Sequence, residues 1–184
     1  NFTNPNSIIT EAITRYTKVE VIGLCNVPLG MTNNVAKILD VDSRRIKIDF
    51  AGLNHMVFGK EIYLDGEKIT DTVLEKVCDG GYMSMNNIPD LNWSADFIKS
   101  LRMLPCPYHR YYFMTEKMLE EEKKSVEEGR GVRAEQVQRI EAELFELYKD
   151  PQLNIKPAAL YKRGGAYYSD AAVSLISSIY NDKK

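Results

Sequence analysis

The sequence predicts an α+β fold, with small mixed sheets and several long helices. Two short runs with strand character, at 19–24 and 45–55, flank an amphipathic segment in the first third of the chain. The later stretches at 114–128 and 133–150 are highly charged and have apolar residues at helical spacing. With 184 residues, 44% of them hydrophobic, the chain can bury one sizeable core, so we expect a single domain.

The chain is expected to open on the end of a strand, which is followed by a helix. Asn4-Pro5 is typical of a turn, and the residues up to Tyr16 predict a helix. A natural chain rarely begins at the end of a strand. We therefore expect residues 1–16 to continue from sequence upstream.

Strand, helix and strand are the next elements that the pattern predicts. The β-branched run 19–24 and the alternating run 45–55 predict strands that end at Cys25 and His55. The chain between them predicts a turn and then a helix.

Turn and cap residues set the expected limits of several elements. Thr32 or Asn33 is available as the N-cap of the helix between the two strands. Asp65-Gly66 lies between two short strand-like runs and predicts a tight hairpin. Pro105 and Pro107 predict a rigid bend that interrupts the helical pattern further on.

Two charged helices and a closing helix complete the expected fold. Gly129 and Gly131 separate the charged helices, whose charges predict solvated faces. A glycine turn then leads to the closing helix, with Ser169 as its expected cap. We expect the apolar stripe of this helix to pack inward.

Charge and cysteine content restrict the partners and the compartment. The 24 Lys and Arg residues are balanced by 26 Asp and Glu, so the formal net charge is -2 and we expect neither nucleic acid nor membrane as a partner. No apolar run approaches the roughly 20 residues that span a bilayer. Cys25, Cys78 and Cys106 form neither a disulfide framework nor a CxxC zinc pattern, so we expect a reducing cytoplasm.

Cys25 and His55 are the pair with the greatest potential for chemistry. Strand ends are places where side chains from separate elements converge on a ligand. A thiolate and a neutral imidazole can share a metal ion, while a buried structural cysteine or a cysteine–histidine nucleophile pair remains an open alternative. The neighbouring Asn26 and Asn54 favour a site, because core positions rarely need amides.

Five segments of the chain, in order, resemble glycoside hydrolase family 4. They are TNPNSIITEA, GLCNVPLG, AGLNHM, PYHRYYF and RGGAYYS. The resemblance implies a two-part enzyme in which a Rossmann domain binds NAD and precedes a metal- and substrate-binding domain of the lactate/malate dehydrogenase-like superfamily. Because no GxGxxG follows a strand here, residues 1–184 would be the C-terminal part alone, without activity of its own.

The chemistry that the resemblance implies differs from hydrolysis by paired carboxylates. NAD takes hydride from carbon 3 of the sugar, a base removes the acidified proton from carbon 2, and the aglycone leaves. Addition of water and reduction of the ketone then complete the hydrolysis. A divalent cation, usually manganese, stabilises the enolate-like charge.

Residue by residue, the resemblance assigns roles to particular positions. Cys25 and His55 match the metal ligands, and Asn4 matches a substrate-binding asparagine. Tyr108 matches the base at carbon 2, with Tyr111 as the fallback. A base role requires cationic surroundings, because an ordinary tyrosine has a pKa of about 10. The alternative for these tyrosines is an aromatic packing cluster. By ligand softness, thiolate and imidazole would prefer zinc, so manganese is implied by the resemblance alone.

Two further residues bear on the substrate. The CN pair formed by Cys25 and Asn26 resembles members that act on 6-phospho-β-glucosides, whereas α-acting members have CD or CH. Arg133 matches an arginine that meets the sugar phosphate, and its guanidinium suits bidentate phosphate binding. The alternative for Arg133 is a solvated residue at a helix start.

Two other functions stay open. The C-terminal half of an NAD-dependent 2-hydroxy acid dehydrogenase has a similar turn and histidine, but it needs no metal. An oligomerisation module built on the long helices is the non-enzymatic alternative. In the intact enzyme we expect a homo-oligomer.

Overall fold

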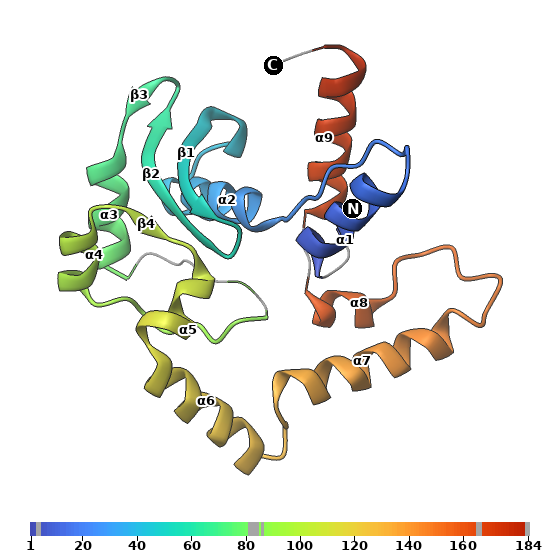
Figure 1. The fold of residues 1–184 in the computed structure, drawn as a ribbon. Coiled ribbons are helices and arrows are strands. Elements are labelled where there is room, and N and C mark those ends of the chain that lie inside the picture. Colours follow the sequence, from blue (N-terminus) through green and yellow to red (C-terminus); the bar gives the residue numbers. More distant parts are fainter. Residues whose placement is uncertain (3–4, 81–84, 86, 165–166, 183–184) are drawn as a thin grey trace.

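A small sheet with helices around it forms one end of the molecule, and two long helices connect this end to the C-terminal helices (Figure 1). The computed structural model describes residues 1–2, 5–80, 85, 87–164 and 167–182. The combination of a sheet with many helices confirms the predicted α+β class.

The sheet is antiparallel and is centred on one long hairpin. Within the described residues its strands are β1 (Ile46–Leu53), β2 (Met56–Leu64), β3 (Glu67–Lys68) and β4 (Leu104–Pro105). β2 pairs with all three of the others. The strand predicted at 45–55 and the hairpin at Asp65-Gly66 are confirmed, and both turn residues have the positive φ, 51° and 90°, that such a turn favours.

Helices account for most of the remaining chain. In order they are α1 (Asn6–Tyr16), α2 (Val27–Leu39), α3 (Thr70–Cys78), α4 (Ala95–Leu101), α5 (Arg110–Phe113), α6 (Thr115–Glu127), α7 (Arg133–Leu147), α8 (Ala158–Arg163) and α9 (Tyr168–Tyr180). Short 3₁₀ turns occur at η1 (Ser43–Arg45) and η2 (Pro107–His109). None of the described helices is long and apolar enough to cross a bilayer.

The core lies between the hairpin and the helices α2, α3 and α4. Val27, Met31 and Val35 repeat at a spacing of four along α2 and are buried. They join Ile46 and Ile48, which alternate along β1 and are buried as well. Burying each such side chain contributes roughly 1.5–3 kcal/mol. This packing holds the start of α2 against the hairpin.

Two expectations near the N-terminus are wrong. Residues 19–24 are not a strand, because the amino group of Asn1 donates to the Ile22 carbonyl and the Leu24 N–H donates to the Asn1 carbonyl. Both bonds go to one residue, so no ladder of successive pairs forms. The next helix, α2, begins at Val27, ahead of the predicted caps Thr32 and Asn33. Pro28 favours this early start because its fixed φ suits the first helical turn.

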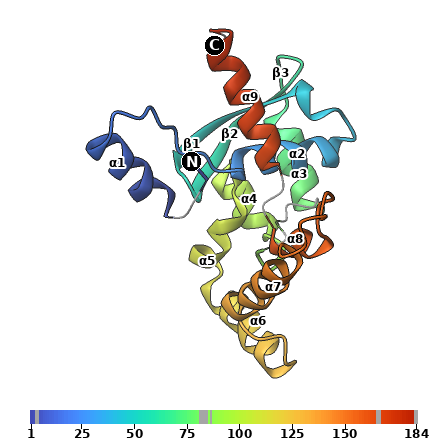
Figure 2. The ribbon, with the colours of Figure 1, turned by 90° about the vertical axis from the view of Figure 1, so that its right-hand side faces the viewer.

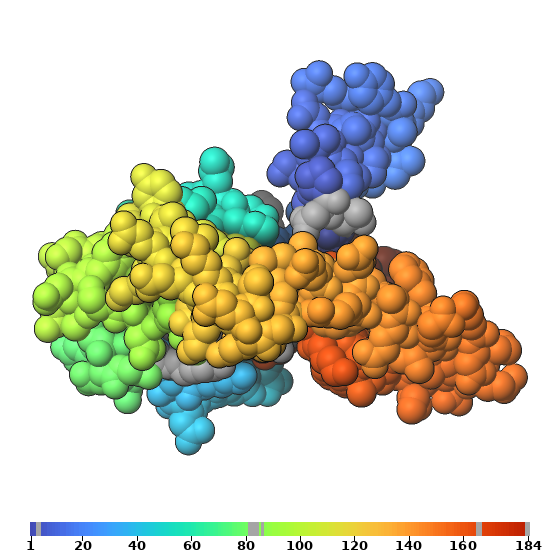
Figure 3. Space-filling model, turned by 90° about the horizontal axis from the view of Figure 1, so that it is seen from below, coloured from blue at the N-terminus to red at the C-terminus, as the bar shows by residue number. Residues whose placement is uncertain are grey.

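The expectation for the closing helix is also wrong. α9 begins at Tyr168, so Ser169 lies inside it and is not its cap. The apolar stripe faces outward, with Val173 65% and Ile176 64% exposed. No residue of α9 is buried, because no described element makes an extended contact with it. α1 also has no buried residue, and Figures 2 and 3 show it projecting from the rest of the chain.

The segment after β4 buries a histidine. The Cys106 N–H donates to Nδ1 of His109 at 3.0 Å, and the centroids of the His109 and Phe58 rings are 4.0 Å apart. His109 is fully buried, and burial lowers its pKa below the ordinary value. The neutral form is therefore the form that the fold holds.

We predict that the chain loses stability as the pH falls from about 7.5 to 5.5. The unfolded chain binds a proton near the ordinary histidine pKa of ~6.5, while folded His109 resists protonation, so acidification favours unfolding. His109→Asn keeps an acceptor near the Cys106 N–H without a titrating ring. Urea unfolding at both pH values should show a smaller loss for this variant. An equal loss in both proteins would contradict the assignment, and His55→Asn separates the effect of the second histidine, whose pKa is also lowered.

Candidate functional site

The structure brings Cys25 and His55 together although 30 positions separate them in the sequence. Cys25 lies immediately before Asn26, the N-cap of α2, and His55 lies in the two-residue turn between β1 and β2. Cys25 Sγ is 3.5 Å from His55 Nε2. The predicted convergence of these two side chains therefore exists in the fold.

The environment of His55 suits a ligand. Its φ of 67° is in the left-handed region, which is unfavourable for a residue with a side chain and often marks a functional position. Burial lowers the pKa of His55, which favours the neutral imidazole. A neutral imidazole can donate its lone pair to a metal ion.

The separation of the two atoms fits a shared ion. Two ligand atoms at roughly 2.1–2.3 Å from one ion lie roughly 3–3.6 Å apart, which includes the observed 3.5 Å. No group of three His, Cys, Asp or Glu side chains suitable for a metal occurs among the described residues. The chain therefore offers Cys25 and His55 as ligands and leaves the other coordination positions to water or substrate.

Tyr108 lies directly against His55. Their rings stack with centroids 4.1 Å apart and planes 16° apart. Asn87 Nδ2 donates a hydrogen bond of 3.1 Å to the Tyr108 hydroxyl oxygen. Tyr111, the fallback base, is 42% exposed, and burial of its remaining surface raises its pKa, which disfavours the phenolate. The geometry thus favours Tyr108.

Arg133 lines a neighbouring cavity of about 390 Å³ together with Asn87 and Tyr111. Its Nη2 atom donates to the Arg163 carbonyl at 2.8 Å, so the side chain is held against the end of α8. A Cβ at Gly164 would meet both Asn87 and Arg133, at 3.6 and 3.9 Å. Arg133 is therefore adjacent to the residue that binds Tyr108. Glu121 and Glu122 also line this cavity and place negative charge on another part of its wall.

Of the two predicted asparagines, the structure describes Asn26. Asn26 is 8% exposed, and its Oδ1 atom accepts a weak hydrogen bond from Cys25 Sγ at 3.9 Å. It therefore lies at the site. Asn4 is outside the described residues.

Three residues at the site were not predicted from the sequence. Asn87 had no signal in the chain around it. Cys106 donates from its thiol to the His55 carbonyl at 3.2 Å, and burial raises the pKa of this thiol. Burial also raises the pKa of Tyr168, and the nearby Cys25 thiol and Tyr108 hydroxyl add to that effect. The RGGAYYS segment, which contains Tyr168, was the one signal that could have found it.

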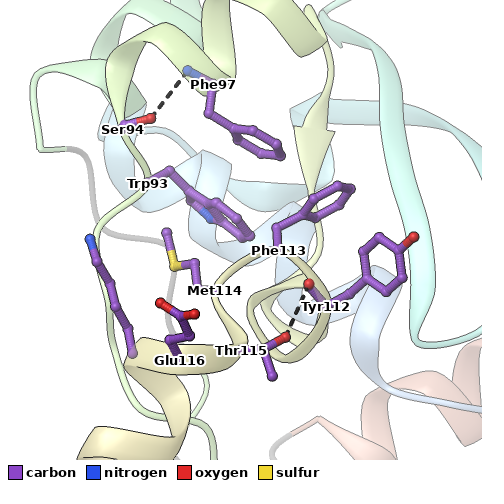
Figure 4. Close-up of a pocket in the computed structure, with 9 residues that line it drawn as sticks. Trp93, Ser94, Phe97, Tyr112, Phe113, Met114, Thr115 and Glu116 are labelled. Atoms are coloured by element: carbon purple, nitrogen blue, oxygen red, sulfur yellow. Dashed lines mark hydrogen bonds between the residues drawn. The ribbon is translucent and has the colours of Figure 1, made fainter.

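A second cavity, of about 430 Å³, lies elsewhere (Figure 4). Trp93 and Phe97 stack at 5.1 Å on one side, and Phe113 lies 4.9 Å from Phe97. The aromatic rings contact one another, as expected of a packing cluster. This cavity has none of the predicted site residues in its lining.

Comparison with known families decides the classification. The sequence profile of the family 4 glycosyl hydrolase C-terminal domain matches residues 50–184, and the profile of family 4 glycosyl hydrolase matches residues 1–41. The chain belongs to glycoside hydrolase family 4.

Relatives of this family 4 chain are longer than the chain itself. It is 57% identical to the probable 6-phospho-beta-glucosidase of Bacillus subtilis (strain 168), over 100% of the chain and 42% of that protein. It is 46% identical to the 6-phospho-beta-glucosidase of Escherichia coli (strain K12), over the same shares. The chain therefore spans 42% of the length of each of these two relatives.

A solved structure has the same fold. The 6-phospho-beta glucosidase from Thermotoga maritima, with manganese, NAD+ and glucose-6-phosphate, matches with a TM-score of 0.72 and 36% identity, over 96% of this chain and 40% of that one. The fold is accordingly that of the C-terminal, lactate dehydrogenase-like domain of the family.

Proposed function

We propose that this chain is the metal- and substrate-binding part of an enzyme that hydrolyses 6-phospho-β-glucosides with NAD and a divalent metal. A related structure contains manganese, which we propose as that metal. The observation that carries the proposal is the arrangement of Cys25, His55 and Tyr108, with a sulfur–nitrogen distance of 3.5 Å beside stacked rings 4.1 Å apart. Two relatives named as 6-phospho-beta-glucosidases, one of them as probable, support the substrate class.

In this proposal residues 1–16 continue from an N-terminal Rossmann domain that holds most of the NAD. The chain has no GxGxxG motif for the pyrophosphate, and it matches only 42% of the two bacterial relatives. The chain by itself would be inactive.

Each of the residues at the site then has a proposed role around carbons 2 and 3 of the sugar. When bound, NAD would supply the hydride acceptor and the metal would supply positive charge that stabilises an enolate. Cys25 and His55 would hold the metal ion beside the substrate. Tyr108, stacked on His55, removes the proton from carbon 2, and Asn87 fixes its hydroxyl oxygen at 3.1 Å. The aglycone then leaves by elimination.

The substrate class depends on two further residues. Asn26 lies beside Cys25, where an amide cannot act as an acid toward an α-linked leaving group, which supports β-glucosides. Arg133 lines the adjoining cavity, and its guanidinium suits the sugar phosphate. Asn4 completes the proposed substrate contacts.

The 2-hydroxy acid dehydrogenase alternative gives no task to Cys25. It would use the histidine as an acid–base group without a metal, whereas here the thiol faces the imidazole at 3.5 Å.

We also propose that the intact enzyme is a homo-oligomer in the cytoplasm. The exposed apolar stripe of Val173, Ile176 and Ile179 on α9 is suited to contacts with another subunit.

Tyr108→Phe in the intact enzyme, with NAD and manganese, should suppress exchange of the proton on carbon 2 and slow turnover. Phe keeps the ring stack on His55 and removes only the hydroxyl. The measurement is the washout of deuterium from carbon 2 of a phosphorylated glucoside, with metal affinity measured in parallel. Tyr111→Phe is the matched control and should stay near the wild-type rate. The reverse pattern would make Tyr111 the base.

Arg133→Ala in the intact enzyme should weaken kcat/KM for phosphorylated glucosides by about 2–3 kcal/mol, the scale of a lost charge-assisted hydrogen bond. Non-phosphorylated analogues should change little. Arg130→Ala is a matched control, because Arg130 lines the same cavity but forms an ion pair with Glu128. An equal loss on both substrates would show that Arg133 supports the fold instead.

A further inference from the structure

We infer that Cys106 is a positioning residue that holds the backbone of His55 so that its imidazole faces Cys25. The inference rests on the proposed function, in which His55 is a metal ligand. Cys106 is distinct from the ligands, because its thiol contacts the main chain of His55 and not the imidazole.

His55 needs such a support because of its own backbone. The residue occupies one of two positions in the turn between paired Leu53 and Met56. With φ at 67°, its backbone adopts a left-handed conformation that glycine and asparagine accept more readily than other residues. A flexible turn would relax from this conformation and redirect the side chain. Surrounding contacts must therefore determine it.

Cys106 supplies a contact that the strand pairing cannot supply. β4 pairs with β2 through Leu104 and Pro105, and the Cys106 N–H donates to the Val57 carbonyl at 3.2 Å. The next ladder bond, to the His55 carbonyl, would come from the Tyr108 N–H, but Tyr108 lies in the 3₁₀ turn η2, where the chain has left the strand. The Cys106 thiol replaces that bond by donating to the His55 carbonyl at 3.2 Å.

Burial makes this contact rigid. Cys106 is fully buried within the core cluster, so its side chain has little freedom to turn away. Two residues later the same segment places Tyr108 on the His55 ring at 4.1 Å. His55 is thus held on its carbonyl by Cys106 and on its ring by Tyr108.

A role as a third metal ligand is the competing explanation for a cysteine at this place. Within the described ranges, however, no three His, Cys, Asp or Glu side chains are grouped as a metal site would require. The thiol is directed to a carbonyl oxygen. A ligand role would require a hydrogen-bonding hydroxyl to fail as a substitute, whereas a positioning role allows it.

The test compares Cys106→Ser with Cys106→Ala in the intact protein, by Mn²⁺ titration followed by electron paramagnetic resonance. The two variants differ only in the donor. We expect Cys106→Ala to bind Mn²⁺ about tenfold more weakly than Cys106→Ser, the lower end of the effect of residues that orient a ligand. Cys78→Ser and Cys78→Ala are the controls and should bind alike, because the Cys78 thiol contacts the Ala95 carbonyl, away from the site.

Equal Mn²⁺ affinity of Cys106→Ser and Cys106→Ala would overturn the inference while leaving the metal site in place. If the wild-type protein binds no Mn²⁺, the proposed function fails, and the inference fails with it. Thermal unfolding of each variant shows whether it is folded at the assay temperature. If Cys106→Ala is not, Cys106→Thr and Cys106→Val repeat the comparison with a larger pair that again differs in the donor.

Discussion

The turn between β1 and β2 is the constraint on which the site depends. It places His55 at a φ of 67°, with Nε2 3.5 Å from Cys25 Sγ, and these two residues come from separate parts of the chain. Cys25 can come this close to His55 because the buried stripe of α2 packs on β1. This packing holds Cys25, which lies just before the N-cap of α2, near the hairpin. Core packing, at roughly 1.5–3 kcal/mol for each buried side chain, thereby determines a distance between two polar atoms.

From this turn a series of contacts leads to the neighbouring cavity. The His55 ring stacks on Tyr108, and the Tyr108 hydroxyl oxygen accepts from Asn87. Asn87 in turn lines the cavity that Arg133 enters from the start of α7. The proposed metal ligand His55, the proposed base Tyr108 and the proposed phosphate contact Arg133 are thus connected by one series of contacts.

Much of the arrangement around the hairpin was predictable from the sequence, because its signals are local. The alternation along 45–55 predicted β1, and Asp65-Gly66 predicted the β2–β3 turn. The strand predicted at 19–24 was wrong, since a strand needs a ladder of successive pairs and the two described backbone bonds of this segment to a neighbouring stretch both go to Asn1. The exposed stripe of α9 was mispredicted for a related reason: periodicity identifies an apolar face but not what covers it.

The residues of the site were likewise predictable only where their signals in the sequence are local. Cys25 and His55 follow short apolar runs and could be found together, whereas Asn87 reaches Tyr108 through a contact across 21 positions that no local pattern records. Cys106 looked like an isolated cysteine, because its role depends on a contact with a turn 51 positions earlier. Long-range hydrogen bonds of this kind are visible only in the folded chain.

The central claim is that Cys25 and His55 share one metal ion. Anomalous diffraction at the manganese edge, from crystals of the intact protein grown with Mn²⁺, tests it most directly. The account predicts a single strong peak between Cys25 Sγ and His55 Nε2, at bonding distance from both atoms. A peak that contacts neither residue, or the absence of any peak while the two side chains are ordered, would contradict it.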